Sequence, residues 1–349
     1  MTAVLIPAYE PEPILVNYVE ELASMGFTVV VADDGSGEAY SGIFAQAAEF
    51  ADVLSFPKNR GKGAVLKSLY AHVLENMPDC SAVVTADSDG QHTSKDVLRI
   101  TKLLESGEKF VLGVRDIGKN APIMSQIGND LSRVVFALSA SLWLKDNQTG
   151  LRGFSRDQLS WMLEVEGDRF DYELSVLWQA AVIGIPMKQI EIQTIYFNNN
   201  SGTHFRKIKD TALLYITLAR CNRAAVVCRF AVFLSLVVLD IAPVDVPFWF
   251  ALPLSWTCGK LICLFIRKLG RFKGLPIKGV LREIGYSVFS LAFTVGIAAL
   301  LKILWDGAPL CLCWLAGRTV VLPLRYFFCK ILSQIAFSTE RSSESSLPK

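Results

Sequence analysis

The apolar positions of the first ninety residues form short runs separated by longer amphipathic stretches. The runs have the length and valine-rich composition of buried strands, and they lie at Ala3–Pro7, Thr28–Ala32, Val53–Phe56 and Ala82–Ala86. The stretches between them have helical length, and they lie near Pro13–Met25, Tyr40–Ala51 and Gly63–Asn76. Strands that alternate with helices predict an α/β fold with a mainly parallel sheet and right-handed crossovers.

The pattern changes after about residue 210, where long apolar stretches replace the mixed composition. Hydrophobic residues make up 52% of the 349 residues, which is high for a soluble protein. We therefore predict a catalytic α/β domain over 1–215, an all-α transmembrane domain of about four helices over 216–337, and a disordered tail over 338–349.

Two of the apolar stretches are long enough to cross a bilayer. Val246–Ile266 has Lys260 as its only charge, and Ile284–Trp305 has only Lys302. The outer two candidates are weaker because they contain more charge, and an interfacial position is the alternative for them. They are Ala224–Leu239, with Arg229, and Ala308–Leu332, with Arg318, Arg325 and Lys330.

Charge in the connecting loops predicts the orientation. Six basic residues lie between the two stronger spans: Arg267, Lys268, Arg271, Lys273, Lys278 and Arg282. The opposite loops hold Asp240, Asp245 and Asp306 and no basic residue. The positive-inside rule places the basic loop, and with it the first domain, on the cytoplasmic side of the cell membrane. Met1–Ile6 agrees, since it is strand-like and lacks the features of a signal peptide.

Composition excludes some classes of function. The net charge is only +2, so the chain lacks the basic face expected of a nucleic-acid-binding protein. Of the eight cysteines only Cys80 lies in the first 220 residues, and no C-x-x-C pair suggests zinc or redox chemistry.

The strongest chemical signal is the segment Asp87-Ser88-Asp89-Gly90-Gln91-His92, directly after an apolar strand. Mg²⁺ and Mn²⁺ prefer oxygen ligands, and they often bind one or two protein carboxylates together with substrate phosphates. Such a cation would neutralise a departing diphosphate. The alternative is a simple turn, since Asp-x-Asp-Gly is also good turn chemistry.

Two other polar segments end predicted strands. Ile6-Pro7-Ala8-Tyr9-Glu10 ends the first, and Asp33-Asp34-Gly35-Ser36 ends the second. Because ligands bind outside the carboxyl ends of parallel strands, we expect these segments and the Asp87–His92 segment to converge on one edge of the sheet.

These segments, together with Asn59-Arg60-Gly61-Lys62-Gly63, resemble in order and spacing the nucleotide-binding half of family-2 glycosyltransferases. The resemblance implies the nucleotide-diphospho-sugar transferase (GT-A) fold. It implies that the donor site includes Pro7, Ala8, Tyr9, Glu10, Asp34, Lys62 and Asp87, with Asp34 on the nucleoside and Lys62 near the phosphates. It also implies that the Mg²⁺ or Mn²⁺ ligands are Asp87, Asp89 and Gln91.

Motifs further along resemble the polyprenyl-phosphate glycosyltransferases. They are Gly113-Val114-Arg115, the stretch Asp146–Phe154, Arg169-Phe170-Asp171-Tyr172-Glu173, and the stretch Asn199–Asp210. The resemblance implies that Asp89, Arg115, Asp146, Gln148 and Arg152 are catalytic, with the arginines on phosphate and Asp146 and Gln148 in the sugar pocket. Two departures are Ser88, where alanine is usual, and the loose match of Asn129 and Arg133 to the acceptor segment.

The acceptor has a physical argument as well. A polyprenyl phosphate is anionic and attacks without losing a proton, so it needs positive charge rather than a general base. Arg115, Arg152, His204 and Arg206 are candidates, and surface ion pairs or snorkelling side chains are the alternative. Asp171 and Glu173 are interpreted equally well as residues that favour a helix start.

The apolar region resembles, more faintly, the GtrA-like domain often fused to such enzymes, and a plain membrane anchor is the alternative.

We predict an inverting transfer of a hexose or N-acetylhexosamine from a nucleotide-diphosphate sugar to a polyprenyl phosphate at the bilayer, for cell-envelope glycosylation. The prediction allows a homo-oligomer. One rival is a transferase that acts on a diacylglycerol or polysaccharide hydroxyl, which would need Asp146 or Asp171 as base. Other rivals are a non-catalytic scaffold or lipid-carrier translocation protein, and a nucleotidyltransferase.

Overall fold

The computed structural model describes residues 1–115, 123–140, 142–193, 216–218, 223–241, 247–269, 277–305, 307–324 and 326–327. Their contacts divide the chain into two compact units. The first is built mainly from residues 1–133, 144–180 and 185–217, and the second mainly from residues after 217. The boundary predicted at residue 215 lies outside the described residues and stays a prediction.

The first unit contains one seven-stranded sheet in the order β3-β2-β1-β4-β6-β5-β7. The strands are β1 (Thr2–Ala8), β2 (Thr28–Asp33), β3 (Asp52–Ser55), β4 (Ala82–Thr85), β5 (Phe110–Arg115), β6 (Arg152–Ser155) and β7 (Lys188–Ile192). All strand pairs are parallel except those of β6, which runs antiparallel to both β4 and β5. The prediction of a mainly parallel sheet is therefore confirmed.

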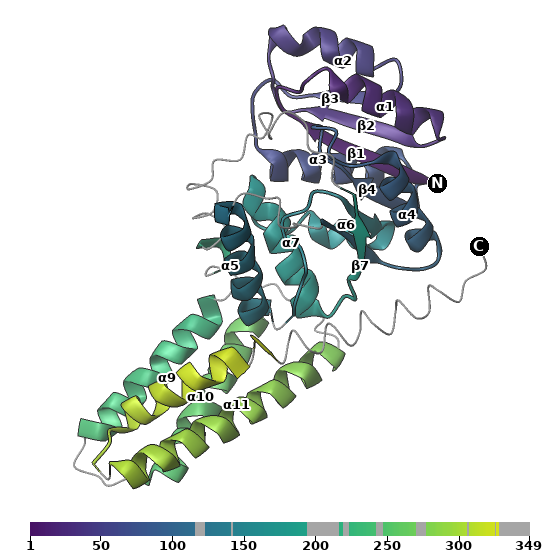
Figure 1. The fold of residues 1–349 in the computed structure, drawn as a ribbon. Helices are drawn as coiled ribbons and strands as arrows, with labels where there is room; N and C mark the ends of the chain where they lie inside the picture. Colours follow the sequence, from purple (N-terminus) through teal and green to yellow (C-terminus); the bar gives the residue numbers. More distant parts are fainter. Residues whose placement is uncertain are drawn as a thin grey trace. The chain divides into compact units, whose positions relative to one another are not determined.

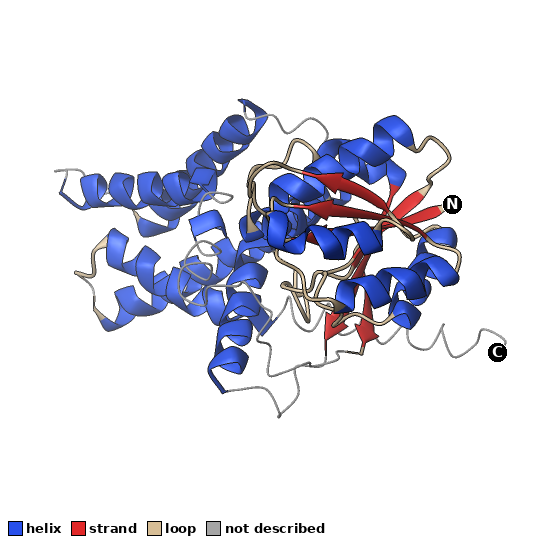
Figure 2. Cartoon of the chain, turned by 90° about the horizontal axis from the view of Figure 1, so that it is seen from above, coloured by secondary structure: helices blue, strands red, loops and turns tan. Residues whose placement is uncertain are grey.

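Helices pack on both faces of this sheet (Figure 2). The helices up to residue 183 are α1 (Ile14–Ser24), α2 (Ser41–Ala47), α3 (Lys62–Asn76), α4 (Ser94–Glu105), α5 (Ile123–Ala140), α6 (Arg156–Met162) and α7 (Phe170–Ile183), with a short 3-10 turn at Glu38–Tyr40. Of these, α1, α3, α4 and α6 contact the strands, and α2 packs on α1. The four strands and three helices predicted for the first ninety residues all form, and their boundaries agree to within a few residues (Figure 1).

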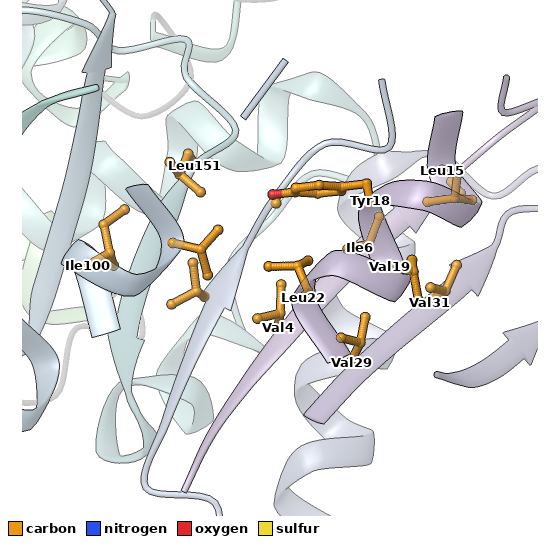
Figure 3. Close-up of a cluster of buried hydrophobic side chains, with 14 of the residues drawn as sticks. Val4, Ile6, Leu15, Tyr18, Val19, Leu22, Val29, Val31, Ile100 and Leu151 are labelled. Carbon is orange, nitrogen blue, oxygen red and sulfur yellow. The ribbon is translucent and has the colours of Figure 1, made fainter. Parts of the chain in front are cut away.

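The core explains why the early strands are apolar without alternation. Successive residues of β1 point to opposite faces, and nearly all are buried because a helix covers each face. On one face, α1 presents Leu15, Tyr18, Val19 and Leu22 at helical spacing to the valines and isoleucine of β1 and β2 (Figure 3). This packing fixes the strand ends that carry the polar segments.

The second unit is helical. Its elements are α9 (Arg223–Ile241), α10 (Phe248–Leu269) and α11 (Ile277–Leu304), followed by a helical stretch over 310–324. Helices thus form at all four stretches predicted to be helical. Asp240 accepts hydrogen bonds from the backbone N–H groups of Leu310 (2.6 Å) and Cys311 (2.9 Å), which caps the start of the last helical stretch.

Large apolar side chains are exposed on the second unit. Ile241, Trp249, Ile303 and Leu304 each expose more than 60% of their surface. Within the described residues, no helix combines the length and the apolarity that a membrane crossing requires. The two stronger spans predicted at Val246–Ile266 and Ile284–Trp305 are therefore not confirmed.

Candidate active site

The three polar segments meet at one edge of the sheet, as predicted. β1 lies between β2 and β4, and all three run parallel. Pro7 and Ala8 end β1 and pair with Ala32 and Asp33 of β2. Beyond the strands, the backbone N–H of Glu10 donates to the hydroxyl of Ser36 (2.8 Å). The Tyr9-Glu10 turn and the Asp33–Ser36 turn are thus joined directly.

Asp34 anchors the loop that carries Lys62. Its buried carboxylate accepts the backbone N–H groups of Arg60 (2.7 Å) and Gly61 (2.9 Å). Burial raises the pKa of Asp34, and these two hydrogen bonds oppose the shift. The predicted contact between Asp34 and a nucleoside stays a prediction. In the structure, Asp34 fixes the loop over residues 59–63 through these two hydrogen bonds.

Lys62 lies between two carboxylates. Its Nζ is 2.7 Å from Oδ1 of Asp87 and 2.9 Å from Oε2 of Glu173. On the other side of Asp87, Nε2 of the buried His92 lies 3.4 Å from Oδ2, at the long end for a hydrogen bond. Burial alone would lower the pKa of Lys62, but the two carboxylates outweigh it and raise that pKa. Lys62 is therefore an ammonium ion at neutral pH.

The two aspartates of the Asp87–Asp89 pair differ electrostatically. Burial disfavours ionisation of Asp87, yet the ammonium of Lys62 and the side chain of His92 together outweigh it and hold the pKa of this carboxyl well below its usual range. For Asp89, burial and the negative charge of Asp87 both raise the pKa. Its Oδ1 accepts the backbone N–H of Gln91 (3.1 Å). A second positive charge near Asp89 would relieve the repulsion between the two carboxylates.

The segment before β6 leaves room for the carboxylate of Asp87. A Cβ atom on Gly150 would overlap that carboxylate, so a larger residue here would force the Asp87 side chain to move. Gly150 is held in place because the hydroxyl of Thr85 donates to its carbonyl oxygen (2.9 Å). This close approach keeps the Asp87 carboxylate at the sheet edge.

The donor set fits a divalent cation of the kind predicted. Asp87 and Asp89 offer carboxylate oxygens at the carboxyl end of β4, while the described residues contain no cluster of three or more His, Cys, Asp or Glu side chains suited to an all-protein metal site. Mg²⁺ and Mn²⁺ are commonly held by one or two carboxylates, with substrate phosphates and water completing the shell. These two residues therefore suit a cation that arrives with a phosphorylated substrate.

Arg115 and Asp146 form a second ion pair at the same edge. Nε of Arg115 donates to Oδ2 of Asp146 (2.7 Å) and Nη2 donates to Oδ1 (3.2 Å). The backbone N–H of Gln148 also donates to Oδ1 (2.9 Å). Burial opposes ionisation of Asp146, but Arg115 and the backbone N–H of Gln148 together outweigh it and lower the pKa. Arg115 is about a quarter exposed, whereas Asp146 is buried.

Arg152 is buried, unlike Arg115. Its Nε donates to the carbonyl oxygen of Thr149 (2.9 Å), and its Nη1 donates to the carbonyl oxygen of Glu173 (2.7 Å). Its Nη2 lies 3.8 Å from the carboxylate of Glu173. The predicted contact of Arg152 with phosphate stays a prediction. In the structure its guanidinium group contacts Thr149 and Glu173.

The sequence interpretation gave no role in the site to three contributors. Glu173, which lies in a family motif and is interpreted equally well as a helix-start residue, is the second partner of Lys62. His92 and Gly150 flank Asp87. Glu173 was missed because it lies over 100 residues after Lys62, and only the fold brings the two together. The glycine at position 150 was the one available signal, since a glycine inside a polar motif often marks close backbone approach.

Part of the predicted acceptor site lies outside the described residues. This applies to the Asn199–Asp210 stretch, including Ser201, His204, Phe205 and Arg206. In α5, Arg133 pairs with Asp130 (2.9 Å). The roles predicted for these residues stay predictions.

The sequence is similar to a family model and to several proteins of other organisms. Residues 3–134 match the model of glycosyl transferase family 2. An uncharacterized protein of Methanocaldococcus jannaschii is 30% identical over 210 residues, which cover 58% of this chain and 85% of that protein. The UDP-N-acetylglucosamine–dolichyl-phosphate N-acetylglucosaminyltransferase of Methanococcus voltae is 26% identical over 215 residues, 55% of this chain and 84% of that enzyme. The polyprenol monophosphomannose synthase of Mycolicibacterium smegmatis is 23% identical over 250 residues, 65% of this chain and 91% of that enzyme.

The fold has a relative among solved structures. The glucosyl-3-phosphoglycerate synthase of Mycobacterium tuberculosis, in complex with Mn²⁺, UDP and glucosyl-3-phosphoglycerate, matches with a TM-score of 0.51 and 16% identity. The match covers 63% of this chain and 79% of that one. It confirms the predicted GT-A-like fold of the first unit. The GtrA-like resemblance of the second unit stays a prediction. By the family model and the relatives that share its sequence, this chain belongs to glycosyl transferase family 2 and is a glycosyltransferase.

Proposed function

We propose that this glycosyltransferase moves a sugar from a nucleotide-diphosphate sugar to a polyprenyl phosphate at the cytoplasmic face of a membrane. The names of two relatives support a lipid-phosphate acceptor, since one acts on dolichyl phosphate and the other is a polyprenol monophosphomannose synthase. The product would be a lipid-linked sugar for cell-envelope glycosylation.

The observation that carries the proposal is the engagement of the candidate bases. A hydroxyl acceptor must lose a proton, so its transferase needs a carboxylate that is free to accept one. Both oxygens of Asp146 accept hydrogen bonds from Arg115 or Gln148, and its lowered pKa makes it a weak base. Asp171 accepts the backbone N–H of Arg169 at one of its oxygens (3.0 Å), so it is the contacts of Asp146 that disfavour a hydroxyl acceptor. A phosphate acceptor requires no such base.

Two cationic side chains of the site, Arg115 and Lys62, are the candidates to contact a phosphate acceptor. Arg115 is partly exposed at the end of β5, and two of its guanidinium nitrogens bond Asp146. That pairing holds the partly exposed guanidinium in a fixed orientation at the sheet edge. Lys62 supplies a second positive charge beside Asp87.

The donor diphosphate would bind next to the Asp87 and Asp89 carboxylates with Mg²⁺ or Mn²⁺. The cation, when bound, supplies the positive charge that a departing nucleoside diphosphate requires. Asp87 and Asp89 would hold it, with Gln91 as the third predicted ligand. The backbone around Pro7–Glu10 and the Asp34-anchored loop would form the walls of the nucleotide site.

Association with a bilayer is part of the proposal. It is supported by the exposed apolar side chains of the second unit, since large exposed apolar patches mark interaction with lipid or protein. The basic residues between α10 and α11 in the sequence favour the cytoplasmic orientation. Anchoring and lipid-carrier movement are both compatible with this surface.

The test is a transfer assay with the purified full chain. Radiolabelled UDP- and GDP-sugars are incubated with Mn²⁺ in the presence or absence of undecaprenyl phosphate, and the organic phase is counted. We expect label in the organic phase only when the prenyl phosphate is present. Label transferred instead to diacylglycerol or an oligosaccharide would contradict the proposal and support a hydroxyl acceptor.

A further inference from the structure

Glu173 is the last of three charged side chains in contact: Asp87 pairs with Lys62, and Lys62 pairs with Glu173. Lys62 bridges the two acids, and the exposed fractions of the three side chains are 17% for Lys62, 31% for Asp87 and 11% for Glu173. Asp87 is thus the more accessible end and Glu173 the more buried end. An ammonium ion in this position can remain paired with one carboxylate if the other takes a new partner.

The backbone holds this arrangement rigidly. The backbone N–H of Ala64 donates to the carbonyl oxygen of Asp168 (3.0 Å). A Cβ atom on Gly61 would overlap the backbone of Asp168, and one on Gly63 would overlap Tyr172. The start of α3 and the segment leading into α7 are therefore in direct contact, and that contact sets Lys62 opposite Glu173.

Glu173 is also in contact with Arg152. The guanidinium of Arg152 donates to its backbone carbonyl oxygen at 2.7 Å but lies 3.8 Å from its carboxylate. The ammonium of Lys62, at 2.9 Å, is therefore the closer charged partner of that carboxylate. Glu173 is oriented by Arg152 and available to Lys62.

From this geometry we propose that Glu173 is a positioning residue for the cation site, which keeps Lys62 in place when Asp87 becomes a ligand of a divalent cation. A doubly charged ion beside Asp87 repels the ammonium of Lys62 and competes with it for the carboxylate. With Glu173 present, Lys62 keeps one full ion pair after this exchange. Without the Glu173 charge, the cation has to displace a lysine that has no other carboxylate partner.

The inference rests on the proposed cation site at Asp87 and Asp89. It adds a residue that touches neither the cation nor the reacting atoms. Its signature is a dependence on Lys62, because Glu173 acts on Asp87 only through that side chain.

The experiment measures Mn²⁺ affinity of the purified full chain without any nucleotide, by electron paramagnetic resonance of the free ion. Four proteins form a double-mutant cycle: wild type, Glu173→Gln, Lys62→Met and the double variant. We expect Glu173→Gln to raise the dissociation constant about tenfold in the wild-type background, because the cation must then displace Lys62 from its remaining carboxylate partner. In the Lys62→Met background we expect less than about a twofold change, because the competing ammonium is gone.

Asp168→Asn is the matched control. Asp168 pairs with Lys67 at 3.2 Å across the same junction between α3 and the segment before α7, but this pair is more exposed and does not include Asp87. The substitution should leave Mn²⁺ affinity unchanged. Glu173→Asp, which keeps the charge, should restore most of the affinity lost in Glu173→Gln.

Each outcome decides between the two proposals. If the wild-type chain binds no Mn²⁺ on its own, the four affinities are measured with UDP present, because the two carboxylates suit a cation that arrives with a phosphorylated substrate. If no Mn²⁺ binds then, the cation site itself is wrong. If Glu173→Gln weakens binding equally in both backgrounds, or not at all, the cation site stands and the role of Glu173 is wrong. If Glu173→Gln does not fold, Lys62→Met alone remains decisive, since it should bind Mn²⁺ more tightly than wild type, and equal or weaker binding would contradict the proposal.

Discussion

Asp87 and Asp146 are both ionised carboxylates at one edge of the sheet, but their partners differ in kind. Asp146 is gripped by two guanidinium nitrogens of Arg115 and by the backbone N–H of Gln148. Asp87 is paired with the ammonium of Lys62, which has a second carboxylate partner of its own. A planar fork is a fixed structural contact, whereas a shared ammonium can give up one partner. The comparison indicates that Asp146 stabilises the site and that Asp87 is free to exchange ligands.

The largest expected effect comes from removing the other half of the Asp87 pair. Asp89→Ala should lower transfer activity by about a thousandfold or more, equivalent to about 4 kcal/mol of transition-state stabilisation, because the cation loses a carboxylate ligand. Burial and the charge of Asp87 raise the pKa of Asp89, so its ionised form is disfavoured in the metal-free fold. The melting temperature at pH 7 should therefore be unchanged or slightly higher. A parallel loss of activity and stability would contradict this separation.

Asp146→Asn should differ from Asp89→Ala, because its main effect should be a loss of stability. Removing one member of a buried ion pair should lower the free energy of unfolding by about 3 kcal/mol at pH 7, measured by urea denaturation. Because the folded pKa of Asp146 is lowered, its contribution is complete above the unfolded value of about 4 and is lost as the pH falls through the folded value. The difference from wild type should therefore narrow below about pH 4.

The control for that experiment is Asp157→Asn. Asp157 is exposed and pairs with the exposed Lys109 at 2.9 Å, so its replacement should change stability by less than about 1 kcal/mol. A loss as large as that of Asp146→Asn would show that burial does not distinguish the two ion pairs.

The smallest expected effect concerns the space beside Asp87. Gly150→Ala places a methyl group 2.3 Å from Oδ2 of Asp87, so the carboxylate must move by about 1 Å to reach a normal contact distance. We expect Mn²⁺ affinity to fall about tenfold, since a carboxylate displaced by that amount no longer meets the geometry that the ion requires. Gly42→Ala is the control, because a Cβ atom there meets open space. Equal affinity in both variants would show that Asp87 adapts freely.

Much of the site could be predicted from sequence because the strand ends carry it. The apolar runs before Asp33-Asp34 and before Asp87 predicted parallel strands, and the carboxyl ends of parallel strands meet at one edge. The convergence of Pro7–Glu10, Asp34 and Asp87 followed from that rule alone. Local pattern was sufficient for the side chains that follow the carboxyl ends of the parallel strands β1, β2 and β4.

The contacts of Lys62 and Arg152 could not be predicted in this way. Lys62 meets Glu173 because two glycines let α3 approach the start of α7, and no local pattern predicts which distant helix will be adjacent. Arg152 was predicted to contact phosphate, yet the described guanidinium contacts are buried carbonyl groups and a carboxylate. The identity of a charged residue in a motif does not reveal whether its side chain contacts a ligand or other residues of the protein.

The position of β6 has a consequence for how the chain acquires its structure. β6 separates β4 from β5 in the sheet, although it follows both in the sequence. During synthesis the first four strands can pair as they emerge, but β5 has no neighbour in the sheet until residues 152–155 or the still later β7 have left the ribosome. Such long-range pairing slows folding and leaves an apolar strand uncovered for the time in which some 40 residues are added. Expression yield should therefore respond to substitutions that make β5 less prone to aggregation, even where they leave the finished enzyme unchanged.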